Sequence, residues 1–264
     1  IPHTPRSLQD VAEALGITAD ALEHTIEQAL PKLAAARAER PAPGLDDKII
    51  TAWNGLMLGA FAHGYWVTST PSFLQTAENA ADFLLERLRQ SDGSLLRTYR
   101  AGRAHLGAYL EDYAYLAEGL LDVYEAGGNP RFLQASRKLS EIALEQFADP
   151  KDGAFFDTPT NHEALVVRPR EGNDGATPNP NAVMAHTLAR LAVHFDRPAW
   201  HARAGTALEA YGKLVGNMPR AFVRTLVAGD FLLEGPVELV FAGHADAPNR
   251  QILRQKAASV FVPN

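Results

Sequence analysis

Cysteine is absent from this chain of 264 residues. Its absence excludes disulfides, thiol catalysis and metal sites built from cysteine. Positive charge is scarce too, since 25 Lys and Arg stand against 31 Asp and Glu, for a formal net charge of -6. A weakly acidic protein is not expected to bind nucleic acid or an anionic membrane non-specifically. The chain does not open on a basic segment followed by an apolar core, so we expect no signal peptide and a cytoplasmic location.

Several patterns that carry specific chemistry are missing as well. The sequence contains no HxH or HExxH pair for a metal ion, no glycine-rich phosphate loop and no GxSxG nucleophile elbow. We therefore expect no metal site and no cofactor. The uncharged run 49–77 is interrupted four times by glycine or proline. This pattern predicts a buried helix followed by a turn rather than a membrane span.

What is present is an ordinary globular composition with an internal repeat. Hydrophobic residues make up 46% of the chain, and charged residues 21%. Three segments begin with the pattern Pro-x-aromatic, at Pro71, Pro130 and Pro198. Proline is favoured in the first turn of a helix because its missing N–H needs no partner there. Each segment has helical periodicity up to a turn signal, so the repeat predicts three amphipathic helices.

A second helix is expected before each of these three. The expected ranges are 54–66, 109–126 and 181–195, and the first contains no Asp, Glu, Lys or Arg. Helices that are apolar on most of their circumference are typically buried. Buried inner helices alternating with amphipathic outer helices predict a mainly α protein. Its expected architecture is a partial α/α toroid, in which three helix pairs form about half of a six-pair ring.

Smaller elements complete the predicted organisation. We expect helices within 7–38 and a short extended piece after each amphipathic helix, at 95–98, 155–158 and 222–225. A strand at 237–241, a helix at 247–258 and a strand at 260–262 would form a small C-terminal βαβ element. The predicted domains are therefore the helical-hairpin region 1–235 and the start of an α/β element, 236–264.

The loops that enter the inner helices are the expected place for chemistry. In a toroid these loops gather at one end, around helix N-termini that carry partial positive charge. The loops are 45–48, which leads into 51–55, 97–107, which leads into 109–113, and 157–179, and the last is long enough to suggest a function. They combine carboxylates, arginines and aromatic side chains. Carboxylate pairs can supply an acid and a base for glycoside chemistry, while aromatic faces stack on sugar rings.

Two carboxylates are the candidate catalytic residues, Asp112 as the acid with a raised pKa and Asp174 as a charged base or stabiliser. Acids in a first helical turn also complement the helix dipole, and Asp174-Gly175 is a turn signal, so structural roles are the alternative for both. Another alternative is proton transfer at a sugar carbon by His105, His162 or His186. The candidate substrate-binding residues are Asp47, Trp53, Asn54, Arg97, Tyr109, Tyr113, Arg168 and Glu171.

Three blocks of the sequence resemble a known family. They are 45–57 (LDDKIITAWNGLM), 109–114 (YLEDYA) and 171–178 (EGNDGATP), in that order. The chain resembles the spermatogenesis-associated protein 20 family of thioredoxin-domain-containing proteins over nearly its whole length. The resemblance implies an α/α part similar to six-hairpin glycosidases and acylglucosamine 2-epimerases. It also implies an N-terminal thioredoxin-like module, which lies outside this sequence, and it supplies no catalytic residues.

Two classes of function are compatible with these observations. The first is a carbohydrate-active domain, a hydrolase or an epimerase, that takes a small carbohydrate as its ligand. The second is a non-catalytic helical module that binds or supports the thioredoxin-like domain of a longer protein. Because half a toroid leaves inner helices uncovered, we expect the chain to pair with the rest of a parent chain or with a second copy.

Overall fold

The computed structural model describes residues 4–163 and 166–242 without a gap, together with residues 244, 249, 252, 253, 256 and 257. The chain divides into two compact units, residues 1–47 and 48–264. The first unit contains α1 (Leu8–Leu15) and α2 (Ala19–Ala38), whose N-caps are Ser7 and Thr18. Both side chains accept a hydrogen bond from the first turn of their helix, which confirms helices in this region.

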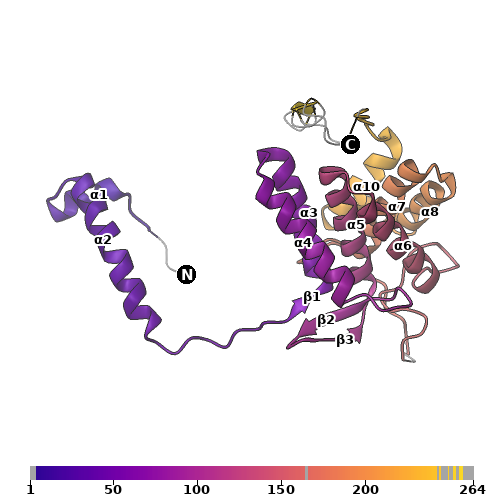
Figure 1. The fold of residues 1–264 in the computed structure, drawn as a ribbon, viewed down its shortest axis with the longest axis horizontal. Helices are drawn as coiled ribbons and strands as arrows, with labels where there is room; N and C mark the ends of the chain where they lie inside the picture. Colours follow the sequence, from indigo (N-terminus) through magenta and orange to yellow (C-terminus); the bar gives the residue numbers. More distant parts are fainter. Residues whose placement is uncertain are drawn as a thin grey trace. The chain divides into compact units, whose positions relative to one another are not determined.

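The second unit is built from helical hairpins (Figure 1). The inner helices are α3 (Thr51–Thr68), α5 (Leu110–Gly127) and α7 (Pro180–Phe195). The outer helices are α4 (Pro71–Arg87), α6 (Pro130–Gln146) and α8 (Pro198–Glu209), and each packs against the inner helix that precedes it. All three outer helices begin at the proline of the Pro-x-aromatic pattern. The predicted pairs are thereby confirmed.

The inner helices form a row in which α5 packs against both α3 and α7. Glycine allows the backbones of α3 and α5 to approach closely, because a Cβ built on Gly55 would lie 2.5 Å from the carbonyl carbon of Tyr115. One turn later, Gly59 lies beside Asp122, so the two helices run parallel. Most residues of α5 are buried, as expected for the inner wall of a toroid.

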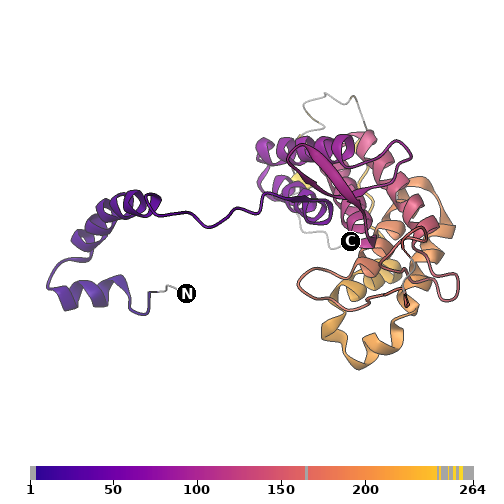
Figure 2. The ribbon, with the colours of Figure 1, turned by 90° about the horizontal axis from the view of Figure 1, so that it is seen from below.

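A small antiparallel sheet lies where α3 and α5 begin. Its strands are β1 (Ile49–Ile50), β2 (Leu96–Arg100) and β3 (Arg103–Gly107), paired in the order β1-β2-β3. Ile49 pairs with Tyr99, and Thr98 pairs with His105. Figure 2 views the second unit from the side of this sheet. The sheet therefore lies at the end of the helices where the entry loops meet.

Two predicted extended segments differ from the structure. Residues 222–225 lie at the start of a helix, α10 (Val223–Glu234), after α9 (Gly212–Asn217) and the short 3-10 helix η1 (Pro219–Ala221). The prediction of a strand there was wrong because Thr225, Ala228 and Phe231 recur every three residues and are buried on one side of α10 against α7 and α8. Residues 155–158 contribute only the isolated bridge of Phe155 with Ala148.

The remaining predictions concern the C-terminal region of the chain. Residues 237–241 are described as irregular chain, so the strand expected there is not present. The predicted strand 260–262 and most of the predicted helix 247–258 fall outside the described residues. The proposed boundary after residue 235 stays a prediction; α10 ends at Glu234. Within the described residues, each helix is too short or too polar to cross a bilayer.

Candidate functional site

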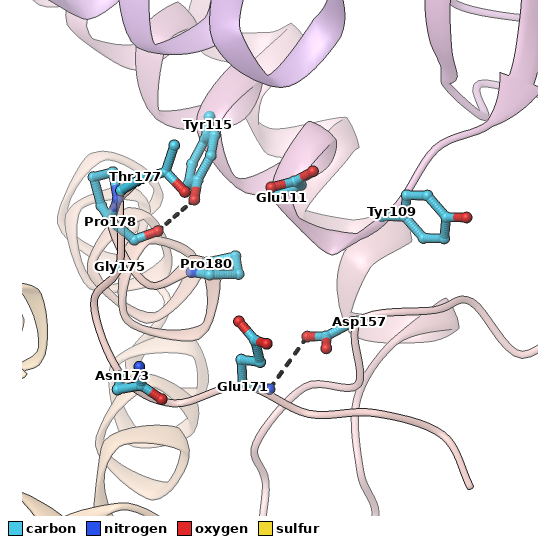
Figure 3. Close-up of a pocket in the computed structure, with 11 residues that line it drawn as sticks. Tyr109, Glu111, Tyr115, Asp157, Glu171, Asn173, Gly175, Thr177, Pro178 and Pro180 are labelled. Atoms are coloured by element: carbon cyan, nitrogen blue, oxygen red, sulfur yellow. Dashed lines mark hydrogen bonds between the residues drawn. The ribbon is translucent and has the colours of Figure 1, made fainter.

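A pocket opens between the start of α5 and the segment that leads into α7 (Figure 3). Its volume is about 340 Å³. One wall comes from α5 and the residue before it, through Tyr109, Glu111 and Tyr115. The opposite wall comes from Asp157 and from the segment 171–180. That segment, here called the pocket segment, supplies Glu171, Asn173, Gly175, Ala176, Thr177, Pro178 and Pro180.

Three carboxylates line this pocket. Glu111 enters from the first turn of α5, whereas Asp157 and Glu171 enter from the long loop opposite (Figure 3). The backbone N–H of Glu171 donates to Oδ1 of Asp157 across 3.4 Å. Burial raises the pKa of Asp157 above its usual range. In the part of the chain that is described, no three His, Asp or Glu side chains are grouped so as to hold a metal ion.

Tyr115 joins the two walls. Its hydroxyl donates a hydrogen bond to the carbonyl oxygen of Pro178, which belongs to the pocket segment. Burial raises the pKa of Tyr115 to about 12, so the phenol keeps its proton and remains a donor at neutral pH. Pro178 and Pro180 place apolar ring surfaces next to the carboxylates. The pocket therefore combines hydrogen-bond acceptors with flat apolar surfaces.

Asp112 lies beside Glu111 in sequence but not in the lining of the pocket. Its side chain is fully buried. Oδ1 accepts the N–H of Ala52 at 3.0 Å, and Oδ2 accepts the N–H of Tyr109 at 2.9 Å and pairs with Arg97 at 3.0 Å. Burial raises the pKa of Asp112 to about 6, although the charge of Arg97 opposes that shift. Asp112 thus holds the starts of α3 and α5 together.

Asp174 is also bound to backbone groups. Oδ1 accepts the N–H of Asn179, and Oδ2 accepts the N–H of Arg224, both at 2.8 Å. Its own N–H donates to the carbonyl oxygen of Ala221 at 2.7 Å. Asp174 is half-buried and lies outside the residues that line the pocket. These contacts match the structural alternative for this residue, and its predicted catalytic role stays a prediction.

Two of the predicted substrate-binding residues, Tyr109 and Glu171, line the pocket. Arg97 lies outside the lining and pairs with Glu111 at 2.7 Å. Tyr113 is buried, and its hydroxyl accepts the N–H of Leu95 at 2.9 Å. Arg168 donates to the carbonyl oxygen of Thr158 within its own loop.

The remaining three predicted residues lie outside the pocket lining. Trp53 is 59% exposed on α3. Asn54 donates from its side chain to the carbonyl oxygen of Ile50 at 2.9 Å, within the first turn of the same helix. Asp47 is exposed and is the last residue of the first unit. Trp53, Asp112 and Asp174, which the sequence predicted as binding and catalytic residues of a carbohydrate site, therefore do not line this pocket.

The candidate histidines lie in three different environments. His105 is exposed on β3, and the ring of His162 lies 5.9 Å from that of Tyr109. His186 belongs to a polar network on α5, α7 and α10. Its Nδ1 lies 2.8 Å from Nη2 of Arg224. The same Nδ1 lies 3.3 Å from Oε1 of Glu118, and burial lowers the pKa of His186.

The same network contains a second arginine. Arg190 pairs with Asp122 at 2.7 Å and with Glu125 at 2.6 Å. Burial raises the pKa of Asp122 to about 6, whereas Arg190 and His194 hold the pKa of Glu125 at about 2 against the effect of burial. Glu118, Asp122 and Glu125 follow Glu111 on one side of α5, so a polar stripe continues from the pocket along this helix.

The polar side chains of the pocket lining that were not among the predicted site residues are Glu111, Tyr115, Asp157, Asn173 and Thr177. Glu111 and Tyr115 are four residues apart, which places them on one face of a helix. That spacing was a usable signal, but an acid in a first turn is explained equally well by the helix dipole. Asp157 and Asn173 belong to the loop that was expected to be functional. Nothing in a loop sequence alone shows which of its polar side chains face a cavity.

Comparison with known proteins supports the family resemblance that the three sequence blocks indicate. No protein-family model matches the chain. The chain is 32% identical to spermatogenesis-associated protein 20 of Mus musculus and 31% identical to that of Homo sapiens, in each case over 98% of this chain and 34% of the relative. The predicted family resemblance is confirmed. The chain spans about a third of the length of the curated relatives it matches.

The solved structures that share this architecture include a mannanase and a sugar epimerase. A GH76 α-mannanase of Bacteroides thetaiotaomicron superposes with a TM-score of 0.55 at 13% identity, covering 82% of this chain and 58% of the mannanase. The cellobiose 2-epimerase of Bacillus thermoamylovorans gives a TM-score of 0.53 at 14% identity, over 62% of this chain and 44% of the epimerase. These likenesses establish the fold, a partial α/α toroid of the six-hairpin glycosidase and epimerase class.

Proposed function

We propose that the pocket at the start of α5 binds a neutral sugar, and that this part of the protein is a carbohydrate-active domain. The observation that carries the proposal is the convergence of Glu111, Asp157 and Glu171 on one open pocket. Ionised carboxylates accept hydrogen bonds from sugar hydroxyls. The flat surfaces of Tyr109 and Pro180 can pack against the apolar face of a sugar ring.

The charge and size of the pocket narrow the class of ligand. Among the described residues that line it, three are acidic and none is Lys, Arg or His. A sugar phosphate or a uronate would be repelled by this lining. A volume of about 340 Å³ lies at the lower end of the range for small-ligand sites. The pocket suits one or two units of a neutral carbohydrate.

The same carboxylates can perform acid–base chemistry. A general acid must hold its proton near neutral pH, and burial raises the pKa of Asp157 in this direction. Glu111, on the opposite wall, then serves as the base or nucleophile on the other side of the bound sugar. Asp112 and Asp174, the acids first predicted to be catalytic, support this arrangement from behind by holding the starts of the helices and the pocket segment.

Binding of defined sugars to the full chain tests the proposal. Calorimetric titration with cellobiose and with α-1,6-mannotetraose is expected to give saturable binding, whereas glucose 6-phosphate and glucuronate give none. The Asp157→Asn and Glu171→Gln variants should each weaken binding about tenfold or more. Glu163→Gln is the control, because Glu163 belongs to the same loop and is not in the pocket lining. Failure of both neutral sugars to bind would overturn the proposal.

The non-catalytic module is the second candidate, and one observation favours it. Trp53, Met57 and Val67 project from one face of α3, with exposed fractions of 59%, 51% and 80%. Exposed apolar surface of this kind is typical of a face that packs against another part of an assembly. Sugar binding without conversion of any tested glycoside or reducing sugar by NMR would favour this candidate. The cytoplasmic location and the pairing with a parent chain or a second copy stay predictions.

A further inference from the structure

Arg97, on β2, contacts three residues at the start of α5. Its Nη2 lies 2.7 Å from Oε1 of Glu111, and its Nη1 lies 3.0 Å from Oδ2 of Asp112. The centre of its guanidinium lies 4.9 Å from the centroid of the Tyr109 ring. Two of these partners, Glu111 and Tyr109, line the pocket. A single cation outside the lining therefore touches two side chains of the pocket wall.

Asp112 makes this contact rigid. Its carboxylate is fully buried and is held by the N–H groups of Ala52 and Tyr109. It cannot rotate without leaving these backbone donors unpaired, which is costly in a buried place. One nitrogen of Arg97 is fixed by this anchor. The planar guanidinium then sets the position of its second nitrogen, and with it the position of Glu111.

We propose that Arg97 is a positioning residue that holds Glu111 and Tyr109 in the geometry needed to bind a ligand, with Asp112 as its buried anchor. The proposal rests on the proposed role of the pocket in sugar binding. A free glutamate populates several rotamers and loses that freedom when a ligand is bound. Because Arg97 imposes one rotamer in advance, the ligand does not have to order Glu111.

Lysine in place of arginine separates positioning from charge. Arg97→Lys keeps a positive charge on β2 but has one nitrogen, so it cannot bridge Glu111 and Asp112 with fixed geometry. We expect Arg97→Lys and Arg97→Gln to weaken the binding of cellobiose or α-1,6-mannotetraose about five- to tenfold. Arg103→Gln is the matched control, since Arg103 is exposed on the neighbouring strand β3, and its binding should equal that of the wild type.

Side-chain NMR gives a readout that a merely structural role would not change. The three-bond couplings of Glu111 should report one χ1 rotamer in the wild type and in Arg103→Gln, and averaged rotamers in both Arg97 variants. The Asp112 carboxyl resonance should also titrate at higher pH in Arg97→Gln, because the charge of Arg97 opposes the effect of burial on that pKa. Both measurements are made on folded protein, with Arg97→Lys available if Arg97→Gln does not fold.

The two proposals fail in different ways. If no neutral sugar binds the wild type, the sugar-binding function is overturned, and the Glu111 couplings still decide whether Arg97 positions this side chain. If sugars bind and Arg97→Lys binds them as tightly as the wild type, with Glu111 in one rotamer, the positioning role is overturned and the sugar-binding function stands. Averaged couplings of Glu111 in the wild type would also overturn the positioning role.

Discussion

The carboxylate of Asp174 accepts the backbone N–H of Arg224 at 2.8 Å, although 50 positions separate the two residues in the chain. Arg224 is the second residue of α10, and N–H groups in a first helical turn have no partner within their own helix. The other oxygen of Asp174 accepts the N–H of Asn179, which is the N-cap of α7. One side chain therefore connects the pocket segment to the starts of α7 and α10.

Removal of this side chain should destabilise the protein without abolishing the fold. Asp174→Ala leaves the N–H groups of Asn179 and Arg224 without their acceptor, at an expected cost of about 1–3 kcal/mol in the free energy of unfolding. Asp174→Asn retains one acceptor and should cost less. Urea denaturation measures both. Asp196→Asn is the control, because Asp196 is exposed at the C-cap of α7 and Asn tolerates its left-handed backbone.

A catalytic role for Asp174 would give the opposite pattern. Asp174→Asn would then remove turnover while leaving the urea midpoint unchanged. That result would contradict a structural role in which Asp174 binds the backbone N–H groups at the starts of α7 and α10.

Stability should depend on pH through Asp112. Its pKa in the folded protein is about 6, against an ordinary value of 3.8, so the folded state binds this proton more tightly than the unfolded state. The resulting stabilisation is complete below the unfolded pKa and is lost as the pH rises through about 6. From pH 5 to pH 7 the free energy of unfolding should fall by roughly 1 kcal/mol on account of this group.

Asp112→Asn should remove that part of the pH dependence. Asp122 has a similarly raised pKa and contributes in the same direction, so part of the dependence remains in the variant. Urea unfolding of the wild type and the variant at several pH values between 5 and 7 measures the difference. Equal slopes for the two proteins would mean that Asp112 does not titrate in this window.

A methyl group on Gly55 should be poorly tolerated. The new Cβ would lie 2.5 Å from the carbonyl carbon of Tyr115, a backbone atom that cannot move without displacing α5. We expect Gly55→Ala to cost about 1–3 kcal/mol or more in the free energy of unfolding. Gly205→Ala in α8 is the matched control, because nothing lies within 4 Å of its new Cβ. Alanine has a higher helix propensity than glycine. The midpoint of thermal denaturation of this control should therefore be unchanged or slightly higher.

Arg190 and Arg197 should differ strongly in their contribution to stability. Arg190→Gln leaves Asp122 and Glu125 without their shared cation in a largely buried place, at an expected cost of about 3–5 kcal/mol. Arg197 is 46% exposed and lies 3.7 Å from Glu141, so Arg197→Gln should cost less than about 1 kcal/mol. The loss in Arg190→Gln should shrink at low pH, as the two carboxylates take up protons. Equal losses of stability in Arg190→Gln and Arg197→Gln would contradict the burial of the ion pairs that Arg190 makes.

The helical hairpins could be predicted because their signals are local. Pro71, Pro130 and Pro198 mark first turns, and proline acts on its own residue and the one before it. The strand predicted at 222–225 failed for the opposite reason. A short segment with β-branched residues such as Val223 and Thr225 fits a strand or a helix equally well, and the contact of α10 with α7 decides between them.

The pocket lies at the predicted loops, and the acid of the first turn of α5 that lines it is Glu111 and not Asp112. Glu111 and Asp112 are adjacent, and consecutive residues point about 100° apart around a helix. This rotation turns Glu111 toward the pocket and Asp112 toward Ala52 and Arg97. Which of the two faces the cavity depends on where α3 and β2 pack against α5. Those contacts involve residues separated by up to 60 positions in the chain, beyond the reach of a local pattern.

The close contact of α3 and α5 has a consequence for how a ligand enters. With Gly55 against the backbone of Tyr115, the two helices cannot slide or separate without losing their packing, so the α5 wall of the pocket behaves as a fixed surface. The opposite wall is a loop segment fastened at Tyr115 and Asp174 by hydrogen bonds that can break and re-form. We therefore expect a ligand that enters the pocket to displace residues 171–180 and to leave α5 in place.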